Sequence, residues 1–179
     1  NNTKGIINNI YKLIWFTLPI RRAKYVVAIS EATKTEILKS VNCNPDKIKV
    51  IYVSISPIYH RFDKEFNKQK PVLLHIGTSQ NKNLVGHIKA IKGLNCKFVI
   101  IGILNDEHIR ELKSNAIDYE NLVNLTDEQV LEQYKRSDIL LFASTYEGFG
   151  MPIIEANTVG RPVITSNILS MPEVADDAA

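Results

Sequence analysis

The second half of the chain alternates short apolar runs with amphipathic segments. The apolar runs predict the strands Val72–Ile76, Phe98–Ile101, Leu122–Val123, Ile139–Ala143 and Val163–Thr165. Helical spacing between them predicts helices near Leu84–Lys92, Asp106–Asn115, Asp127–Arg136 and Pro152–Val159. Thr126 and Gln129 form a capping box before the third of these helices. Alternation at this short spacing predicts an α/β fold, a Rossmann-like parallel sheet with helices on both faces.

The first part of the chain is less regular and ends in a segment without periodicity. Helical spacing marks Ile6–Leu18, which is too short and too polar to cross a membrane. A buried parallel strand, a helix capped by Ser30 and a second apolar run follow at Tyr25–Ser30, Glu31–Val41 and Ile48–Val53. We therefore expect residues 1–56 to end one domain, residues 57–70 to be a linker, and residues 71–179 to form the Rossmann-like domain.

Composition excludes several classes of protein. Hydrophobic residues make up 45% of the 179, which is enough for a core, and the net charge of +3 is too small to indicate a nucleic-acid partner. Cys43 and Cys96 lack paired spacing, which argues against a disulfide scaffold and fits a reducing, cytoplasmic setting. No histidine or cysteine cluster has metal-ligand spacing, so we expect no metal and no cofactor.

Three loops should meet at one edge of the predicted sheet. Ligands of doubly wound sheets bind outside the carboxyl ends of the strands. The segments that follow strands there are residues 77–83, 124–126 and 145–152. The first carries Lys82, which can act as a point charge on a diphosphate, and Gly77, which permits a sharp turn. No complete dinucleotide-binding or Walker glycine motif is present.

Two glutamates bracket the third segment. Glu147 lies on the turn Gly148-Phe149-Gly150, and Glu155 lies about one turn into the following helix, which Pro152 helps to open. Each feature alone also fits an ordinary tight turn or an acid placed by the helix dipole. Together with Lys82, they suit a ligand whose hydroxyls bond to carboxylates and whose phosphate meets free helix amides.

Residues 144–156, Ser-Thr-Tyr-Glu-Gly-Phe-Gly-Met-Pro-Ile-Ile-Glu-Ala, resemble a known motif. The Glu-x7-Glu spacing is similar to that of the retaining glycosyltransferases of family 4. Gly-Arg-Pro-Val-Ile-Thr-Ser-Asn, which follows, and His-Ile-Gly-Thr before Lys82 extend the resemblance, which covers the chain from about residue 20. The resemblance implies the GT-B architecture, with residues 1–56 as the last elements of the acceptor-side domain and residues 71–179 as the nucleotide-sugar-binding domain.

The resemblance also implies roles for individual residues. Glu147 and Lys82 would be catalytic: Glu147 would hold the donor sugar, and Lys82 would neutralise the leaving diphosphate. Glu155 would hold the ribose, and the loop at Asn124 and Leu125 would border the base. The full set implied for donor binding is Gly77, Thr78, Lys82, Asn83, Asn124, Leu125, Glu147, Gly148, Phe149, Gly150, Met151, Pro152 and Glu155.

The chain departs from the family pattern in three ways. Thr78 stands where the family commonly has an arginine, and Ser54-Ile55-Ser56 replaces a motif that ends in Asp. Most of the first domain is absent, and the chain begins at Asn1 rather than at methionine. We therefore expect a fragment, truncated at its C-terminus and inactive alone, of an enzyme of polysaccharide or glycoconjugate biosynthesis.

Two alternative functions and one further partner stay open. A non-catalytic nucleotide-sugar-binding module, or a nucleotide-sugar epimerase of the same architecture, would share these residues. The expected partners are a nucleotide-sugar donor and a sugar or lipid-linked acceptor. Because Arg21, Arg22 and Lys24 follow the first predicted helix, a peripheral contact with the inner membrane face is also an expectation.

Overall fold

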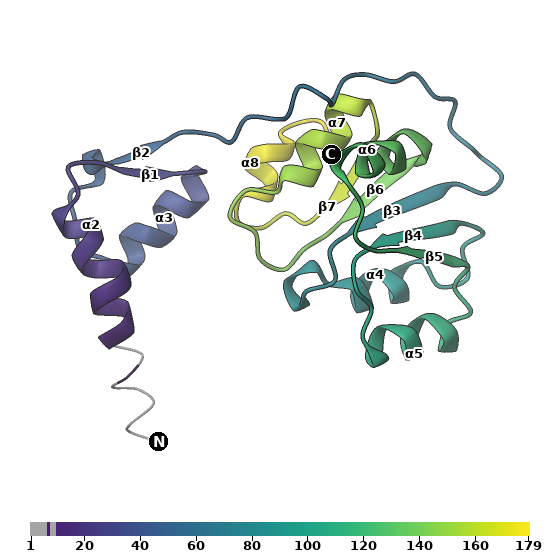
Figure 1. Cartoon of the computed structure of the whole chain (residues 1–179), viewed down its shortest axis with the longest axis horizontal. Helices are drawn as coiled ribbons and strands as arrows, with labels where there is room; N and C mark the ends of the chain where they lie inside the picture. Colours follow the sequence, from purple (N-terminus) through teal and green to yellow (C-terminus); the bar gives the residue numbers. More distant parts are fainter. Residues whose placement is uncertain (1–6, 8–9) are drawn as a thin grey trace. The chain divides into compact units, whose positions relative to one another are not determined.

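The computed structural model describes residue 7 and residues 10–179, which form two compact units (Figure 1). The first unit ends at Val53 and the second begins at Ser54. The division lies a few residues before the segment 57–70 that the sequence suggested as a linker. Each unit is described on its own.

The first unit pairs two parallel strands with a helix over them. Its elements are η1 (Leu13–Thr17), α2 (Leu18–Arg22), β1 (Val26–Ala28), α3 (Glu31–Ser40), η2 (Pro45–Lys47) and β2 (Ile48–Val50). Val26 pairs with Ile48 in the parallel register. The Ser30 side chain accepts a hydrogen bond from the Thr33 amide, so Ser30 caps α3 as the sequence predicted. A small core joins the two strands to α2 and α3.

Two expectations for this unit need correction. The first helix does not end at Leu18 but continues to Arg22, and its expected start at Ile6 lies outside the described residues. The helix is continuous through the wide π-type turn Leu13–Thr17, and Pro19 lies just after that turn, where its ring nitrogen has no hydrogen to donate. Tyr25–Ser30 is not a fully buried strand, because Tyr25 and Val27 keep more than half of their surface exposed.

The second unit is built on a five-stranded parallel sheet. Its strands are β3 (Val72–Ile76), β4 (Lys97–Ile101), β5 (Tyr119–Leu122), β6 (Ile139–Phe142) and β7 (Val163–Thr165), in the spatial order β5-β4-β3-β6-β7. The helical elements are η3 (Gln80–Lys82), α4 (Leu84–Ala90), α5 (Asp106–Ser114), α6 (Asp127–Arg136), α7 (Met151–Val159) and α8 (Met171–Ala175). The chain order reverses between β3 and β6, which creates the crevice where ligands of such sheets bind.

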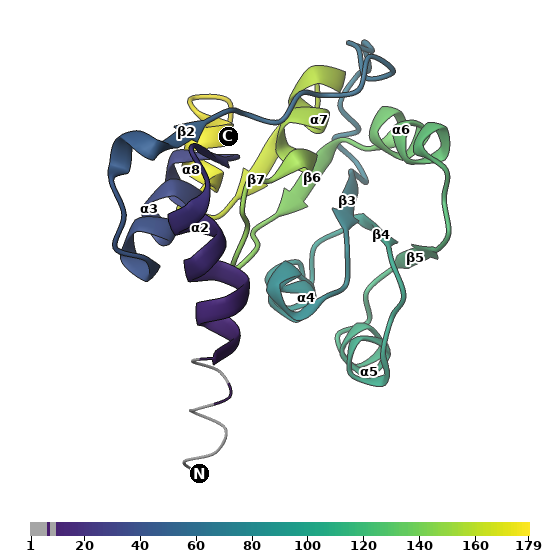
Figure 2. The ribbon, with the colours of Figure 1, turned by 60° about the vertical axis from the view of Figure 1, so that its left-hand side comes forward.

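Neighbouring residues of each central strand face opposite layers. Leu73 packs with α4 and α5, whereas Leu74 packs with α6, α7 and α8. Figure 2 shows α4 and α5 on one side of the sheet and α6 and α7 on the other. Apolar side chains on both faces explain why the central strands read as continuous hydrophobic runs. The predicted parallel sheet with helices on both faces is confirmed.

The sequence misplaced the edge strand and missed the short helical segments. β5 is Tyr119–Leu122 rather than Leu122–Val123, because an edge strand needs no continuous apolar run and this one carries Glu120 and Asn121. The segments η3 and α8 were not predicted. The other helix and strand ends of this unit agree with the predictions to within two residues.

The segment 57–70 contains no helix or strand, yet it is anchored to the second unit. Tyr59 and Phe62 pack against the core beneath α6 and α7. Arg161 is buried and donates hydrogen bonds to the carbonyls of Phe62, Tyr134 and Lys135. One guanidinium thus joins this segment to the end of α6, which fixes the path of the segment.

Asp138 forms the second anchor of this segment. Its carboxylate accepts hydrogen bonds from the amides of Asn67, at 3.0 Å, and Val72, at 2.7 Å, and pairs with the Lys64 ammonium. Burial opposes its charge, but these partners together leave the pKa of Asp138 below its usual value.

Within the described part of the chain, no helix has the length and apolar character that crossing a membrane requires.

We expect Asp138→Ala to lower the free energy of unfolding of the second unit by about 3 kcal/mol. The substitution removes the acceptor of the Asn67 and Val72 amides and the partner of the partly buried Lys64 ammonium. Urea unfolding followed by circular dichroism measures the loss. Asp118→Ala is the matched control: Asp118 is also an ion-paired acid, with Lys70 and Lys97 as its partners, but it is half exposed. It should cost less than about 1 kcal/mol. Equal losses would contradict the assignment of Asp138 as an anchor.

Candidate functional site

An ion pair joins two of the three predicted loops. Lys82 Nζ lies 2.7 Å from Glu147 Oε1, and both side chains are largely buried. The ammonium also lies 4.6 Å from the centre of the Phe142 ring, which favours a cation. The two candidate catalytic residues, 65 positions apart in sequence, are therefore direct partners at the carboxyl edge of β3 and β6.

The contacts around this pair form a clasp, which we define as residues 81–83 and His87 bonded to residues 143–147. Asn81 Nδ2 donates to the Tyr146 carbonyl, and the Asn81 carbonyl accepts from the Thr145 amide at 2.8 Å. Lys82 meets Glu147, as described above. Asn83 and His87 complete the clasp by holding the Ala143 peptide: Asn83 Nδ2 donates to its carbonyl and the Ala143 amide donates to His87 Nε2.

Backbone geometry at two positions makes the clasp possible. Asn83 has φ +56°, a left-handed conformation that asparagine tolerates better than most residues, and it turns the chain from η3 into α4. A Cβ added to Gly86 would lie 2.4 Å from Asn83 Oδ1. Gly86 therefore leaves room for the Asn83 side chain that reaches the Ala143 carbonyl.

Gly77 and Thr78 shape the start of the first loop. Gly77 has φ +89°, and a Cβ there would meet the Lys82 side chain at 3.0 Å, so the glycine lets the lysine stem lie over the backbone. Thr78 Oγ1 donates to the Ile103 carbonyl at 2.7 Å. The residue that replaces the family's usual arginine is thus bonded to the loop after β4.

The glycine turn leads directly into α7. Gly150 has φ +106° and precedes Met151 and Pro152 in the first turn, while Phe149 is buried. The Glu147 carbonyl accepts a hydrogen bond from the buried Ser170 Oγ at 3.0 Å, which fixes the backbone of the acid. The amides that open α7 therefore lie on a firmly held turn beside the ion pair.

Glu155 has partners of its own. Its Oε2 accepts a hydrogen bond from Tyr134 Oη at 2.7 Å, and Tyr59 lies close to the same carboxylate. Burial raises the pKa of Glu155. Burial and the charge of Glu155 together raise the pKa of Tyr134 well above its usual value and the pKa of Tyr59 to about 12. Tyr134 is fully buried, and its hydroxyl orients Glu155.

The remaining predicted loop, residues 124–126, stands apart from the clasp. Asn124, with φ +55°, and Leu125 follow β5, which is two strands away from β3. They precede α6, whose Asp127 acts electrostatically on Glu155. The structure therefore joins Lys82 to Glu147 by direct bonds, and it relates Glu155 to α6 rather than to that pair.

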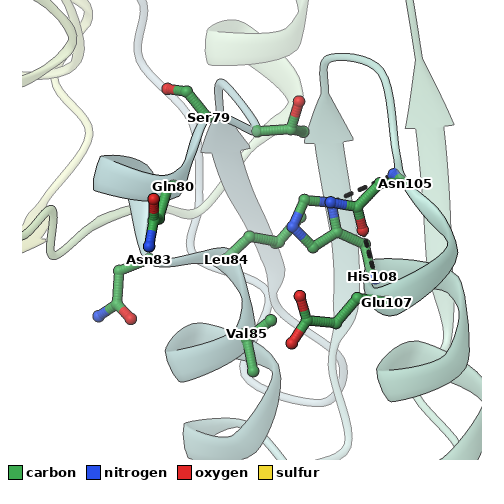
Figure 3. Close-up of a pocket in the computed structure, with 9 residues that line it drawn as sticks. Ser79, Gln80, Asn83, Leu84, Val85, Asn105, Glu107 and His108 are labelled. Carbon is green, nitrogen blue, oxygen red and sulfur yellow. Dashed lines mark hydrogen bonds between the residues drawn. The ribbon is translucent and has the colours of Figure 1, made fainter. Parts of the chain in front are cut away.

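A polar pocket of about 430 Å³ opens beside the first loop, between the starts of α4 and α5 (Figure 3). Its lining includes Thr78 and Asn83 from the predicted set, together with Asn105, Glu107 and His108, which the sequence reasoning missed. The signal was available, since Asn105 follows β4 at the same edge of the sheet. No group of three metal-ligating side chains occurs among the described residues.

Residues 59–179 match the family model of the glycosyl transferases group 1, so the chain belongs to this family. Over 98% of its length it is 28% identical to the O-antigen chain mannosyltransferase RfbU of Salmonella typhimurium, and it covers 51% of that protein. It is 29% identical to the O-antigen chain mannosyltransferase B of Escherichia coli, with 87% of the chain and 46% of the relative covered. The chain spans about half the length of these curated relatives.

Solved structures confirm the fold. A glycosyltransferase from Rickettsia africae matches with a TM-score of 0.75 at 21% identity, covering 94% of this chain and 50% of that one. Anabaena HepE, solved with UDP and glucose, matches with a TM-score of 0.72 at 19% identity, covering 87% and 48%. The predicted class, a glycosyltransferase with the GT-B type of Rossmann-like domain, is confirmed.

Gly86→Ala should destabilise the second unit by about 1–3 kcal/mol, although alanine normally favours a helix, because the new methyl group displaces the Asn83 side chain. In the Asn83→Gly background the clash is absent, so the same substitution should become neutral or stabilising. A double-mutant cycle of urea unfolding measures this reversal of sign. Additive effects would show that the Asn83 side chain does not depend on Gly86.

Proposed function

We propose that the chain is the donor-binding half of a retaining glycosyltransferase. The enzyme would transfer a sugar from a nucleotide-sugar donor to a sugar or lipid-linked acceptor in polysaccharide synthesis. The observation that carries the proposal is the Lys82–Glu147 pair beside the turn that opens α7. A cation, a hydroxyl acceptor and the N-terminal end of a helix at one edge match the groups of a sugar diphosphate.

The ion pair supplies a physical account of donor binding. Without donor, Lys82 and Glu147 neutralise each other in a nearly buried position. A diphosphate would take the ammonium as its partner, and Glu147 would then be free to accept hydrogen bonds from the hydroxyls of the transferred sugar. Lys82 would remain on the diphosphate as the bond to the sugar breaks and negative charge develops.

Glu155 is suited to the ribose. Tyr134 donates to Oε2, which orients the carboxyl group, and a carboxylate has further lone pairs that could accept from a diol. Because Glu155 faces α6, the base would lie toward the loop at Asn124 and Leu125. Donor binding would thus extend from the clasp, across the start of α7, to the loop after β5.

The first loop offers little positive charge to the diphosphate. Residues 77–83 contain one cationic side chain, Lys82, and Thr78 replaces the usual arginine. We therefore propose that the α7 amides carry a larger share of diphosphate binding than in relatives with that arginine, and that no metal takes part. The names of the relatives make a nucleoside-diphosphate mannose the first donor to test.

Calorimetric titration with nucleoside diphosphates and their mannose and glucose conjugates tests the proposal. Lys82→Ala should weaken binding of both ligand types by at least about tenfold, since one charge-assisted contact is lost. Glu155→Gln should weaken both about equally. Glu147→Gln should leave diphosphate binding equal or stronger, because its competitor for Lys82 is gone, but should remove the advantage of the sugar conjugate.

Glu132→Gln is the matched control for the glutamates, since Glu132 is an exposed acid of α6 that pairs with Lys135. It should bind as the parent does. If Glu155→Gln also binds as the parent does, the ribose assignment is wrong. If a labelled donor is epimerised rather than transferred by the longer enzyme, the reaction class is wrong.

We also propose that residues 10–24 make a peripheral membrane contact. Trp15 is 74% exposed and Tyr11 61%, and Arg21, Arg22 and Lys24 follow them. An exposed apolar face followed by cations suits an anionic lipid surface.

Trp15 is the only tryptophan, so its emission reports on this region alone. Anionic vesicles should shift the emission of Trp15 to the blue and co-sediment the protein, and added salt should reverse both effects. The double charge reversal Arg21→Glu/Arg22→Glu should bind much less. Unchanged emission with anionic vesicles would remove this contact from the proposal.

A further inference from the structure

Two buried histidines connect the inner ends of the clasp. His75 lies on β3 and is fully buried, and His87 lies on α4 and is 3% exposed. Their Nδ1 atoms are 3.0 Å apart, and their rings meet edge to face. No role for either histidine was predicted from the sequence. Their ring nitrogens instead carry a connected set of hydrogen bonds.

The backbone determines which nitrogens of the two rings carry protons. The Ala143 amide is 3.0 Å from His87 Nε2, and a backbone N–H can only donate, so that Nε2 is unprotonated. In a neutral ring the proton then lies on His87 Nδ1, which donates to His75 Nδ1. His75 Nδ1 is thereby an acceptor, and the proton of His75 lies on Nε2.

This arrangement runs from the end of one strand to the end of another. The hydrogen bonds lead from the Ala143 amide, just after β6, through the His87 ring to the His75 ring near the end of β3. No hydrogen-bond partner for His75 Nε2 is found among the described residues. The Leu141 carbonyl lies 3.2 Å from His75 Nδ1, farther than His87 Nδ1, and the proton that His87 Nδ1 donates into the 3.0 Å contact leaves no room for a second proton on His75 Nδ1.

Burial keeps both rings neutral. It lowers the pKa of His75 to about 3, with His87 adding to the effect, and lowers the pKa of His87 to about 4. Lys82 also acts on His75, in the sense of disfavouring its charge. At neutral pH the pair therefore adds no positive charge beside Lys82.

We propose that His75 and His87 are positioning residues whose single arrangement of protons fixes the Glu147 loop against the Lys82 loop. Two aliphatic side chains could fill the same space, but they would leave the Ala143 amide without an acceptor. Because Ala143 lies four residues before Glu147, a shift of its peptide moves the start of the loop that carries the acid. The effect on donor binding rests on the proposed function, whereas the proton arrangement does not.

The first test is an NMR measurement of the ring nitrogens in protein labelled with 15N-histidine. The chain has four histidines, and single glutamine variants assign their signals. At pH 7 we expect His87 to be protonated at Nδ1 only and His75 at Nε2 only. A His87 protonated at Nε2, a His75 protonated at Nδ1, or a doubly protonated ring in either residue would overturn the proposal.

The second test compares two substitutions of His87. In His87→Gln the side-chain carbonyl can accept from the Ala143 amide, whereas in His87→Leu no acceptor remains. We expect the amide signals of residues 143–147 to stay near their parent positions in the glutamine variant and to move in the leucine variant. Nucleoside-diphosphate affinity should fall less than about threefold in the former and about tenfold or more in the latter.

The outcomes separate the two proposals. If both variants leave the 143–147 amides unchanged, or move them equally while both stay folded by circular dichroism, the positioning role is wrong. If the leucine variant moves these amides and the parent binds no nucleotide, the positioning role holds and the proposed function fails. His60→Leu, a change at an exposed histidine outside the clasp, should alter neither measurement.

Discussion

The clasp, in which residues 81–83 and His87 bond to residues 143–147, is the interaction on which the site depends. Its two sides follow β3 and β6, neighbouring parallel strands paired through Leu73 with Ile139 and Leu74 with Leu140. The strand pairing sets the two loops in register, and side chains then bond across at each step. Several peptide groups of residues 143–147 are hydrogen-bonded across the clasp, so this loop has little freedom to slide along its neighbour. The position of Glu147 is therefore a consequence of sheet register and not of the helix α7 that follows it.

The clasp contains one ion pair, between Lys82 and Glu147. Lys82 is the cation of the first loop; it lies against Glu147 and over Phe142, in surroundings that a second positive charge would disturb. The nearby histidines are buried and neutral, and Thr78 adds no charge. In the proposed function, an incoming diphosphate therefore competes with one carboxylate for one ammonium. Ligand affinity then depends on the difference between two charge-assisted contacts, which is smaller than either of them alone.

How much the sequence could predict depended on the range of each interaction. Apolar runs marked β3 and β6 because both faces of these strands are buried, but β5 escaped because Glu120 and Asn121 suit an edge. The rule for the carboxyl ends of strands brought Lys82 and Glu147 to one edge. The hydrogen bond of Tyr134 to Glu155 was not predictable, because it joins two helices whose relative rotation is set by packing.

The two acids of the motif are held by different layers, and this separation has a functional meaning. Glu147 is tied to the loop before α4 on one side of the sheet, and Glu155 to α6 on the other. Seven intervening residues, including the start of α7, keep a fixed backbone between them. A ligand that engages both acids must therefore cross the point where the strand order reverses. A single sugar ring offers hydroxyls to one acid, whereas a sugar joined to a ribose through a diphosphate offers hydroxyls at both ends and a charge in between.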